Sequence, residues 1–367
     1  MLNNSYLLLD ASALRDNVRS LREELGAAAL VPVIKDDAYG LGAVSVAQIL
    51  TGCGVDTFAV SHVSEGLILR EAGIRSTIWL LSIPLDRHLL PAVEAGLIPP
   101  LASFRQFELL KKAAQTLGKP IPVQLKLDSG LHRIGFTEAE LSELIRTLPA
   151  YAPWLDIVGT FSHFSDNAPE TMERQFALFR RMTEALHAAG IDPGLRHISS
   201  SASLEADTKY NLDAVRIGRR LYMDNPDKPT GRIREAASFR AYLTDIRQRQ
   251  AGDSLAYGDS FHLAADTRVG VLSVGYGDGL DLNLFRCHAP VLINGQRAGL
   301  LECCMDQSFV DLSGVDCEVG DEVTFFGYDG RGHFLSAQEV ASAIGANEGC
   351  ALTGALTLRV ARRTVNG

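Results

Sequence analysis

The sequence predicts an α/β protein in which an N-terminal (β/α)8 TIM barrel, residues 10–230, precedes a mostly β domain, residues 231–367. Over the first 230 residues, eight short apolar runs alternate with amphipathic helical stretches. After that point, short strands separated by turn signals replace the alternation. A chain of 367 residues with 46% hydrophobic content is long enough to bury two cores.

The barrel strands are expected where apolar or β-branched residues run together. These runs lie near residues 30–34, 58–60, 78–81, 97–101, 123–127, 157–161, 197–198 and 215–217. Helical periodicity fills the intervals, as in residues 14–25, where Asp10 and Ser12 precede the helix as candidate caps. Pro99 and Pro100 fall inside the fourth run, and a proline weakens a strand.

Turn residues mark the second domain. Asn294-Gly295 separates two strand-like segments and predicts a hairpin with a type I′ turn. Glycine-rich segments at residues 257–259, 275–279 and 328–330 predict further turns. The apolar residues 6–9 are expected to add an N-terminal strand, within residues 1–9, to this domain.

Composition excludes several classes of function. The net charge of −9 argues against a nucleic-acid partner, because phosphate backbones require clustered positive charge. No apolar run approaches the length of a membrane span. The six cysteines show neither the density of a disulfide scaffold nor a CxxC pair, so we expect no metal site and a cytoplasmic protein with reduced thiols.

A lysine stands where the first predicted strand ends. Lys35 follows the apolar residues 31–34 and precedes the glycine-bearing turn 36–42. A lysine amine with a lowered pKa can condense with an aldehyde to form a Schiff base. A lysine that closes a strand is more often simply solvated, so this pattern alone does not establish catalysis.

Other polar residues follow other predicted strands at the same barrel face. Arg133, His163, Ser201, Arg216 and Gly218 all lie at or just after strand ends, where barrels place their active sites. Each alone has a structural explanation, such as an ion pair, a buried histidine or a helix cap. Together with Lys35 they indicate a site.

The chemistry of this set favours pyridoxal 5′-phosphate. A serine-rich loop and a glycine after the last strand offer N–H groups to a phosphate. A phosphorylated aldehyde that condenses with lysine is pyridoxal phosphate, which makes an amino acid's Cα proton acidic. An arginine at position 216 would keep the pyridine nitrogen neutral and so favour simple proton exchange over longer transformations.

Seven further segments extend the match to a known family. The chain resembles the fold type III pyridoxal-phosphate racemases, above all the alanine racemase family, in its lysine segment from Lys35 to Gly42. Similar motifs follow in the family order at residues 127–136, 159–164, 197–202, 215–222, 255–261, 275–279 and 305–307. The resemblance spans nearly the whole chain and implies an isomerase, a racemase that interconverts L- and D-alanine.

The resemblance implies a role for each matching residue. Lys35 and Tyr257 are the two acid/base groups on opposite faces of the substrate, with Tyr257 supplied by the second subunit of a homodimer. Arg133 and the backbone at Met305 bind the substrate carboxylate, and Lys126 matches a family lysine that can be carbamylated. The cofactor-binding residues implied are Lys35, Tyr39, His163, Ser201, Arg216, Gly218 and Arg219.

The chain departs from the family pattern near its C-terminus. A family tyrosine that contacts the phosphate and the substrate side chain aligns with Gly349 or Cys350. The smaller residue opens the pocket, so serine or a longer amino acid is an alternative substrate. Arg219 and Arg220 replace small or apolar residues, and Asp36 replaces an apolar one.

Two other classes of function stay open. A decarboxylase of the same fold type would need an acidic partner at the ring nitrogen, which Arg216 opposes. A non-catalytic cofactor-binding protein would keep Lys35 and turn nothing over.

Overall fold

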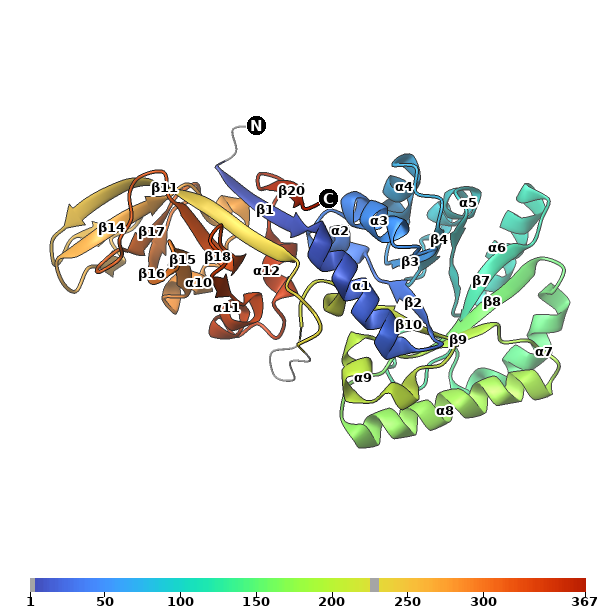
Figure 1. Cartoon of the computed structure of the whole chain (residues 1–367). Helices are drawn as coiled ribbons and strands as arrows, with labels where there is room; N and C mark the ends of the chain where they lie inside the picture. The colour runs from blue at the N-terminus through green and yellow to red at the C-terminus, as the bar shows by residue number, and fades with distance from the viewer. Residues whose placement is uncertain (1–3, 225–230) are drawn as a thin grey trace. The chain divides into compact units, whose positions relative to one another are not determined.

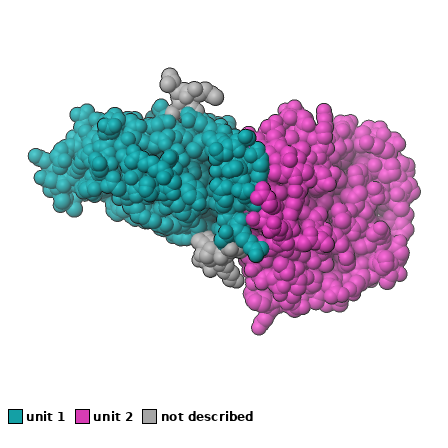
Figure 2. Space-filling model, in the orientation of Figure 1, with its two compact units in different colours: residues 1–17, 37–42, 221–367 teal, residues 18–36, 43–220 magenta. Residues whose placement is uncertain are grey.

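The computed structural model describes residues 4–224 and 231–367, which form two compact units (Figure 2). The parallel-strand unit contains residues 18–36 and 43–220. The antiparallel unit contains the described residues of 1–17, 37–42 and 221–367. The expected order of an N-terminal α/β region and a C-terminal mostly β region is therefore confirmed.

Strands of the parallel-strand unit pair only in parallel and alternate with helices. Their bounds are β2 (Ala29–Pro32), β3 (Thr57–Val60), β4 (Thr77–Leu80), β5 (Leu97–Ile98), β6 (Pro100–Leu101), β7 (Ile121–Lys126), β8 (Leu155–Phe161), β9 (Leu195–His197) and β10 (Ala214–Ile217). The pairings are β10 with β2, β3-β4-β5, and β6-β7-β8-β9. Each of the eight predicted runs overlaps a strand, and Pro99 divides the fourth into β5 and β6.

Amphipathic helices connect these strands (Figure 1). They are α1 (Ala11–Leu25), which begins in the antiparallel unit, α3 (Ala43–Gly52), α4 (Val63–Glu71), α5 (Asp86–Glu94), α6 (Arg105–Leu117), α7 (Leu141–Tyr151), α8 (Pro169–Ala188) and α9 (Ser201–Ala206). In α8, a proline at the first position starts the helix, and Met172, Phe179, Met182 and Leu186 share its buried face at helical spacing. Side chains of α5 to α8 join those of β6 to β8 in one apolar cluster, and a second, smaller cluster contains residues of β2, β3, β4, β5 and β10.

The short helix α2 (Lys35–Tyr39) is left-handed after its first residue. Asp36, Asp37, Ala38 and Tyr39 have φ angles of 55°, 51°, 55° and 57°. Four successive residues in this region are unusual for L-amino acids, because Cβ approaches the following carbonyl oxygen. The turn after Lys35 is therefore a strained segment whose conformation must be stabilised by contacts with the rest of the fold.

A closed barrel of six antiparallel strands forms the core of the antiparallel unit. Its strands are β11 (Ala237–Arg249), β14 (Thr267–Leu272), β17 (Ser308–Asp311), β16 (Gln296–Cys303), β15 (Pro290–Ile293) and β18 (Glu322–Tyr328). Strand β18 pairs with both β15 and β11, which closes the ring. The Asn294-Gly295 hairpin is confirmed, because both residues have positive φ and Ile293 pairs with Gln296.

Shorter elements complete this unit. Strand β1 (Ser5–Asp10) pairs antiparallel with β11 and parallel with β20 (Ala361–Val365). The others are β12 (Ser254–Leu255), β13 (Phe261–His262), β19 (Phe334–Leu335), α10 (Asn283–Arg286), α11 (Ala337–Ala343) and α12 (Cys350–Ala355). Within residues 4–224 and 231–367, no helix combines the length and the apolar character that a membrane crossing requires.

Candidate active site

The first candidate residue, Lys35, is fixed through its neighbour on the chain. The backbone N–H of Asp36 donates to Glu65 Oε1 at 2.6 Å. Glu65 lies in the first turn of α4, and its other oxygen accepts from the N–H groups of Ser61 and His62 at 2.7 and 2.8 Å. One carboxylate thus ties the chain after β2 to the loop after β3.

Arg216 is buried within β10, and several carbonyl and imidazole groups orient its guanidinium. Nη2 donates to the carbonyls of Ser162 and Ile198 at 2.8 and 3.1 Å and to His163 Nδ1 at 3.1 Å. Nη1 donates to His197 Nδ1 at 2.5 Å. Among the described residues, its hydrogen-bond partners include no carboxylate. Burial, followed by the charge of Arg133, lowers the pKa of Arg216 to about 9.

Both histidines that contact Arg216 are neutral at physiological pH. Burial lowers the pKa of His163 to about 3, and it places the pKa of the fully buried His197 well below its usual value. Because Nδ1 of His197 accepts from Arg216, Nε2 carries the proton and donates to Gln124 Oε1 at 3.1 Å. The imidazole of His197 also stacks on Trp79 and Phe161, with ring centroids at 4.6 and 5.2 Å.

Four basic side chains influence the imidazole of His163, and one of them, Arg216, contacts it directly. After burial, the charges that lower the pKa of this histidine are those of Arg216, Lys126, Arg133 and Lys35, in that order. A group of four basic residues that depress one buried histidine creates a positive potential inside the unit. The arrangement is suited to an anionic ligand.

Lys126, one of these four basic residues, is the last residue of β7. Its amine donates to the carbonyl of Leu127 at 3.1 Å and lies 5.0 Å from the centre of the Phe161 ring. Burial, reinforced by the charge of Arg216, lowers its pKa to about 7. Gly135 packs against Lys126, since a Cβ at this position would lie 2.9 Å from Lys126 Cγ, and its φ of 117° is open only to glycine. Packing therefore requires a glycine at position 135, within the motif of residues 127–136 that also contains Arg133.

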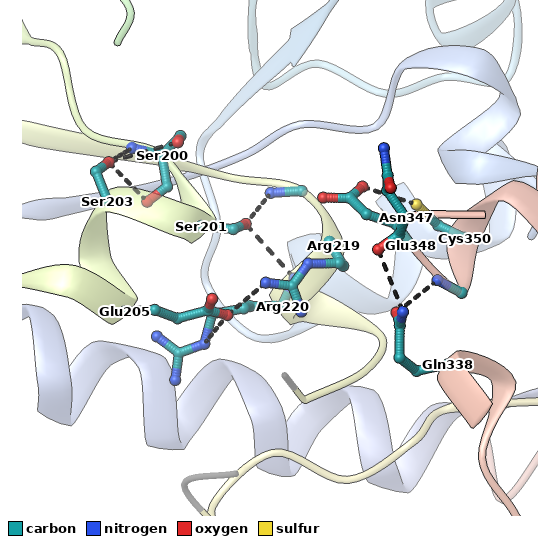
Figure 3. Close-up of polar contacts among 12 residues, drawn as sticks. Ser200, Ser201, Ser203, Glu205, Arg219, Arg220, Gln338, Asn347, Glu348 and Cys350 are labelled. Carbon is teal, nitrogen blue, oxygen red and sulfur yellow. Dashed lines mark hydrogen bonds and ion pairs between the residues drawn. The ribbon is translucent and has the colours of Figure 1, made fainter. Parts of the chain in front are cut away.

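Ser201 joins the loop after β9 to the turn after β10. Its Oγ accepts from the N–H of Gly218 at 3.1 Å and from the N–H of Arg220 at 3.5 Å (Figure 3). The hydroxyl proton of Ser201 is left to donate elsewhere. Arg219, also buried, lies in the same turn. Seven of the predicted site residues lie in the parallel-strand unit, where hydrogen bonds join Arg216 to His163 and Ser201 to Gly218: Lys35, Arg133, His163, Ser201, Arg216, Gly218 and Arg219.

The remaining predicted residues belong to the antiparallel unit. Tyr39 lies in the left-handed turn, and its ring centroid is 5.9 Å from that of Tyr222. Tyr257 is 68% exposed and Met305 is 48% exposed. The charge of nearby Cys304 is the main influence that raises the pKa of Tyr257. Tyr257 therefore lies beside the loop that carries Met305.

The glycine segment 275–279 supports that loop. The N–H of Gly277 donates to the carbonyl of Met305 at 2.9 Å. A Cβ on Gly275 would lie 2.3 Å from the carbonyl oxygen of Cys304, so only glycine fits where the two backbone segments come this close. The two motifs that are separate in the sequence thus form one local structure.

The segment that departs from the family pattern leads into α12. Cys350 is the first residue of this helix, and its thiol donates to Glu348 Oε2 at 3.3 Å. Gln338 accepts from the N–H of Gly349 at 2.9 Å and donates to the carbonyl of Asn347 at 3.2 Å (Figure 3). The small residues at 349 and 350 are held by their own hydrogen bonds.

Sequence reasoning missed three residues that orient the site. His197 belongs to a predicted strand and to the motif 197–202 but was given no role of its own, and Gln124 was predicted only as a strand residue; together they form a chain of hydrogen bonds to Arg216. Glu65, which anchors the backbone after Lys35, carries no motif of its own. The available signal for His197 was its position in the sequence. It ends a predicted strand directly before the serine-rich loop, and that strand lies next to β10, which carries Arg216.

Comparisons with known proteins agree in pointing to one family. Two family models match, described as alanine racemase, N-terminal domain, over residues 9–226 and alanine racemase, C-terminal domain, over residues 236–364. An alanine racemase from Pectobacterium atrosepticum is 34% identical, with 98% of each chain covered. One from Desulfosudis oleivorans is 31% identical over 99% of this chain and 97% of the relative.

Solved structures show the same likeness. The alanine racemase from D-cycloserine-producing Streptomyces lavendulae superposes with a TM-score of 0.92 at 28% identity, covering 100% of this chain and 98% of that one. The alanine racemase from Streptomyces coelicolor A3(2) has a TM-score of 0.91 at 30% identity, covering 99% and 98%.

Proposed function

This chain belongs to the alanine racemase family, and from that premise we infer that it interconverts L- and D-alanine with pyridoxal 5′-phosphate as its cofactor. The observation that carries the inference is the group of basic residues around His163 in which Arg216 has no carboxylate partner among the described residues. A decarboxylase of this fold type would need an acidic group in place of Arg216.

The residues present fit the cofactor. We propose that Lys35 holds its aldehyde carbon, that the buried guanidinium of Arg216 contacts the pyridine nitrogen with His163 beside it, and that Tyr39 contributes to phosphate binding. Ser201 and the backbone N–H groups of Gly218 and Arg219 would hold the phosphate. When bound, pyridoxal phosphate withdraws electrons from the substrate Cα and makes its proton acidic.

Two groups on opposite faces then move the proton. Inversion at Cα requires one group to take the proton from one face and another to return a proton to the other face. We assign these roles to the amine of Lys35 and the hydroxyl of Tyr257. The hydroxyl of Tyr257, whose pKa is raised mainly by Cys304, is protonated at neutral pH and can therefore return a proton to Cα.

Substrate recognition follows from the remaining residues. We propose that Arg133 and the backbone at Met305 bind the carboxylate that every α-amino acid carries. A small residue, Gly349 or Cys350, stands where the family has a tyrosine, which supports a pocket that also admits serine or a longer amino acid.

The proposed architecture is a closed (β/α)8 barrel of residues 10–230, followed by a β domain of residues 231–367 to which strand β1 adds. Parallel pairing of β10 with β2 supports closure of the barrel, as do the parallel bridges of Val33 with Ala59 and of Ser200 with Arg216. We further propose a homodimer in which Tyr257 of one subunit serves the site of the other. A cytoplasmic location stays a prediction.

Exchange of the Cα hydrogen tests this function. Purified protein with cofactor should convert L-alanine to D-alanine and incorporate solvent deuterium at Cα from both enantiomers. Tyr257→Phe should suppress exchange mainly from one enantiomer, because it removes the acid/base group from one face only. Equal slowing of both, under conditions where proton transfer limits the rate, would contradict the two-base assignment.

A further inference from the structure

Helix α9 contacts the turn after β10 at two levels. Ser201 and Glu205 are four residues apart in α9 and therefore lie on one face of the helix. Ser201 Oγ accepts from the backbone of the turn at Gly218 and Arg220, as described above. One helical turn further on, Glu205 Oε1 accepts from Arg219 Nη2 at 2.5 Å and lies 3.5 Å from Arg220 Nε (Figure 3). A hydroxyl and a carboxylate thus hold the same three-residue turn.

The ionic part of this contact is buried. The side chains of Arg219, Arg220 and Glu205 are 9%, 0% and 7% exposed. Arg220 also donates to both oxygens of Glu24 in α1, at 2.8 and 2.9 Å. Among the described contacts, the carboxylates of Glu205 and Glu24 lie against the two guanidinium groups beside the turn. Burial of charges costs desolvation energy, and the arrangement therefore serves geometry rather than attraction of an anion.

We propose that Glu205 is a positioning residue for the phosphate group of the cofactor. The proposal rests on the proposed function, in which Ser201 and the backbone at Gly218 and Arg219 bind that phosphate. Glu205 accepts a hydrogen bond from Arg219 and lies within ion-pair distance of Arg220, and in this way it fixes the turn of residues 218–220 against Ser201. The donors are then in place before the cofactor arrives, and less conformational freedom is lost on binding.

The proposal makes the dependence on Glu205 specific to the phosphate. Pyridoxal has the same ring and aldehyde as pyridoxal phosphate and lacks only the phosphate. Its binding relies on Lys35 and Arg216, which Glu205 does not contact in the described structure. A loss confined to the phosphorylated ligand is a signature that a general effect on folding would not produce.

The test is Glu205→Gln in the cofactor-free, full-length protein, with both ligands titrated to equilibrium and followed by protein fluorescence. The Kd for pyridoxal phosphate should rise about tenfold or more, the usual effect of losing charge-assisted hydrogen bonds that organise a site. The Kd for pyridoxal should stay within about twofold of the wild-type value. Glu184→Gln is the matched control, because Glu184 forms an exposed ion pair with Arg180 on α8, and it should change neither Kd.

A second variant addresses folding, because Glu205→Gln removes the carboxylate charge that faces a buried guanidinium. Glu205→Leu combined with Arg219→Met replaces the ion pair by apolar groups of similar volume and should keep the thermal unfolding midpoint of the cofactor-free protein within about 5 °C. It should still weaken pyridoxal phosphate more than pyridoxal. Unchanged or tighter binding of pyridoxal phosphate, or an equal loss for both ligands, would overturn the proposal. A wild-type protein that binds neither ligand would instead refute the proposed function.

Discussion

Lys126 illustrates how burial of a single residue sets its chemistry. Its pKa of about 7 reflects the loss of solvation at the end of β7 and the repulsion of Arg216. As a free amine, Lys126 also repels Arg133, which lowers this pKa further. Carbamylation, which the family resemblance suggests for Lys126, would replace this repulsion by attraction, because a carbamate is negatively charged. The neutral amine present above pH 7 is the form that reacts with carbon dioxide.

Lys126→Met should reveal the cost of this buried amine as a pH-dependent gain in stability. In the folded state the pKa is about 7 instead of 10.5, so between these values the unfolded state binds more protons and wild-type stability rises with pH. The advantage of the methionine variant is therefore largest below pH 7 and shrinks toward pH 10, by roughly 1 kcal/mol per pH unit.

Urea unfolding in bicarbonate-free buffer, where the amine stays unmodified, measures this difference. Lys112→Met on the exposed face of α6 is the control and should show no such pH dependence. A constant difference between Lys126→Met and wild type across this pH range would show that Lys126 keeps its ordinary pKa.

At the scale of elements, the left-handed turn α2 explains a residue that the sequence left unexplained. Asp36 replaces an apolar family residue and has a φ of 55°. Aspartate and asparagine tolerate this region better than other non-glycine residues, because their short polar side chains bond locally. Its N–H meanwhile binds Glu65. The aspartate thus suits the conformation that follows Lys35.

Substitutions at Asp36 test the left-handed conformation directly. Asp36→Val should lower the free energy of unfolding by about 1–2 kcal/mol, since a β-branched residue is strained at positive φ. Asp36→Asn and Asp36→Gly should stay close to wild type in the same denaturant titration. A valine variant as stable as the asparagine variant would mean that the turn is not left-handed in solution.

Periodicity predicted the strands well because each buried strand leaves a local apolar run. The eight runs agree with the observed strands within two residues at their ends, and even the break at Pro99 had a visible cause. The left-handed form of α2 had no such signal, since Ala38 and Tyr39 do not favour positive φ. Glu205 and His197 were also missed as parts of the site, because their partners are distant in the sequence and only the fold brings them together.

At the scale of the whole molecule, the exposure of Tyr257 is the feature that favours a second subunit at the active site. A tyrosine that is 68% exposed, near a methionine that is 48% exposed, leaves two large apolar groups in solvent. A proton donor in open solvent also lacks the fixed geometry that catalysis requires. Both difficulties are resolved if a partner subunit covers Tyr257 and brings its own Lys35 to it.

Mixing two inactive variants tests this arrangement. Lys35→Ala and Tyr257→Phe should each be nearly inactive alone as alanine racemases. If each site combines Lys35 of one chain with Tyr257 of the other, a hybrid dimer contains one intact site and one doubly altered site. Refolding the variants together in equal amounts makes half of the dimers hybrids, so about a quarter of the wild-type activity should return.

The recovered activity also distinguishes a shared site from one built within a single chain. If Lys35 and Tyr257 of the same chain formed the site, every site in the mixture would lack one group, and no activity would return at any mixing ratio. The mixing ratio offers a further check, because hybrids are most abundant at equal amounts and the activity should therefore peak there. Cofactor binding by the Tyr257→Phe variant alone should match wild type, which confirms that its Lys35 site is intact in the hybrids.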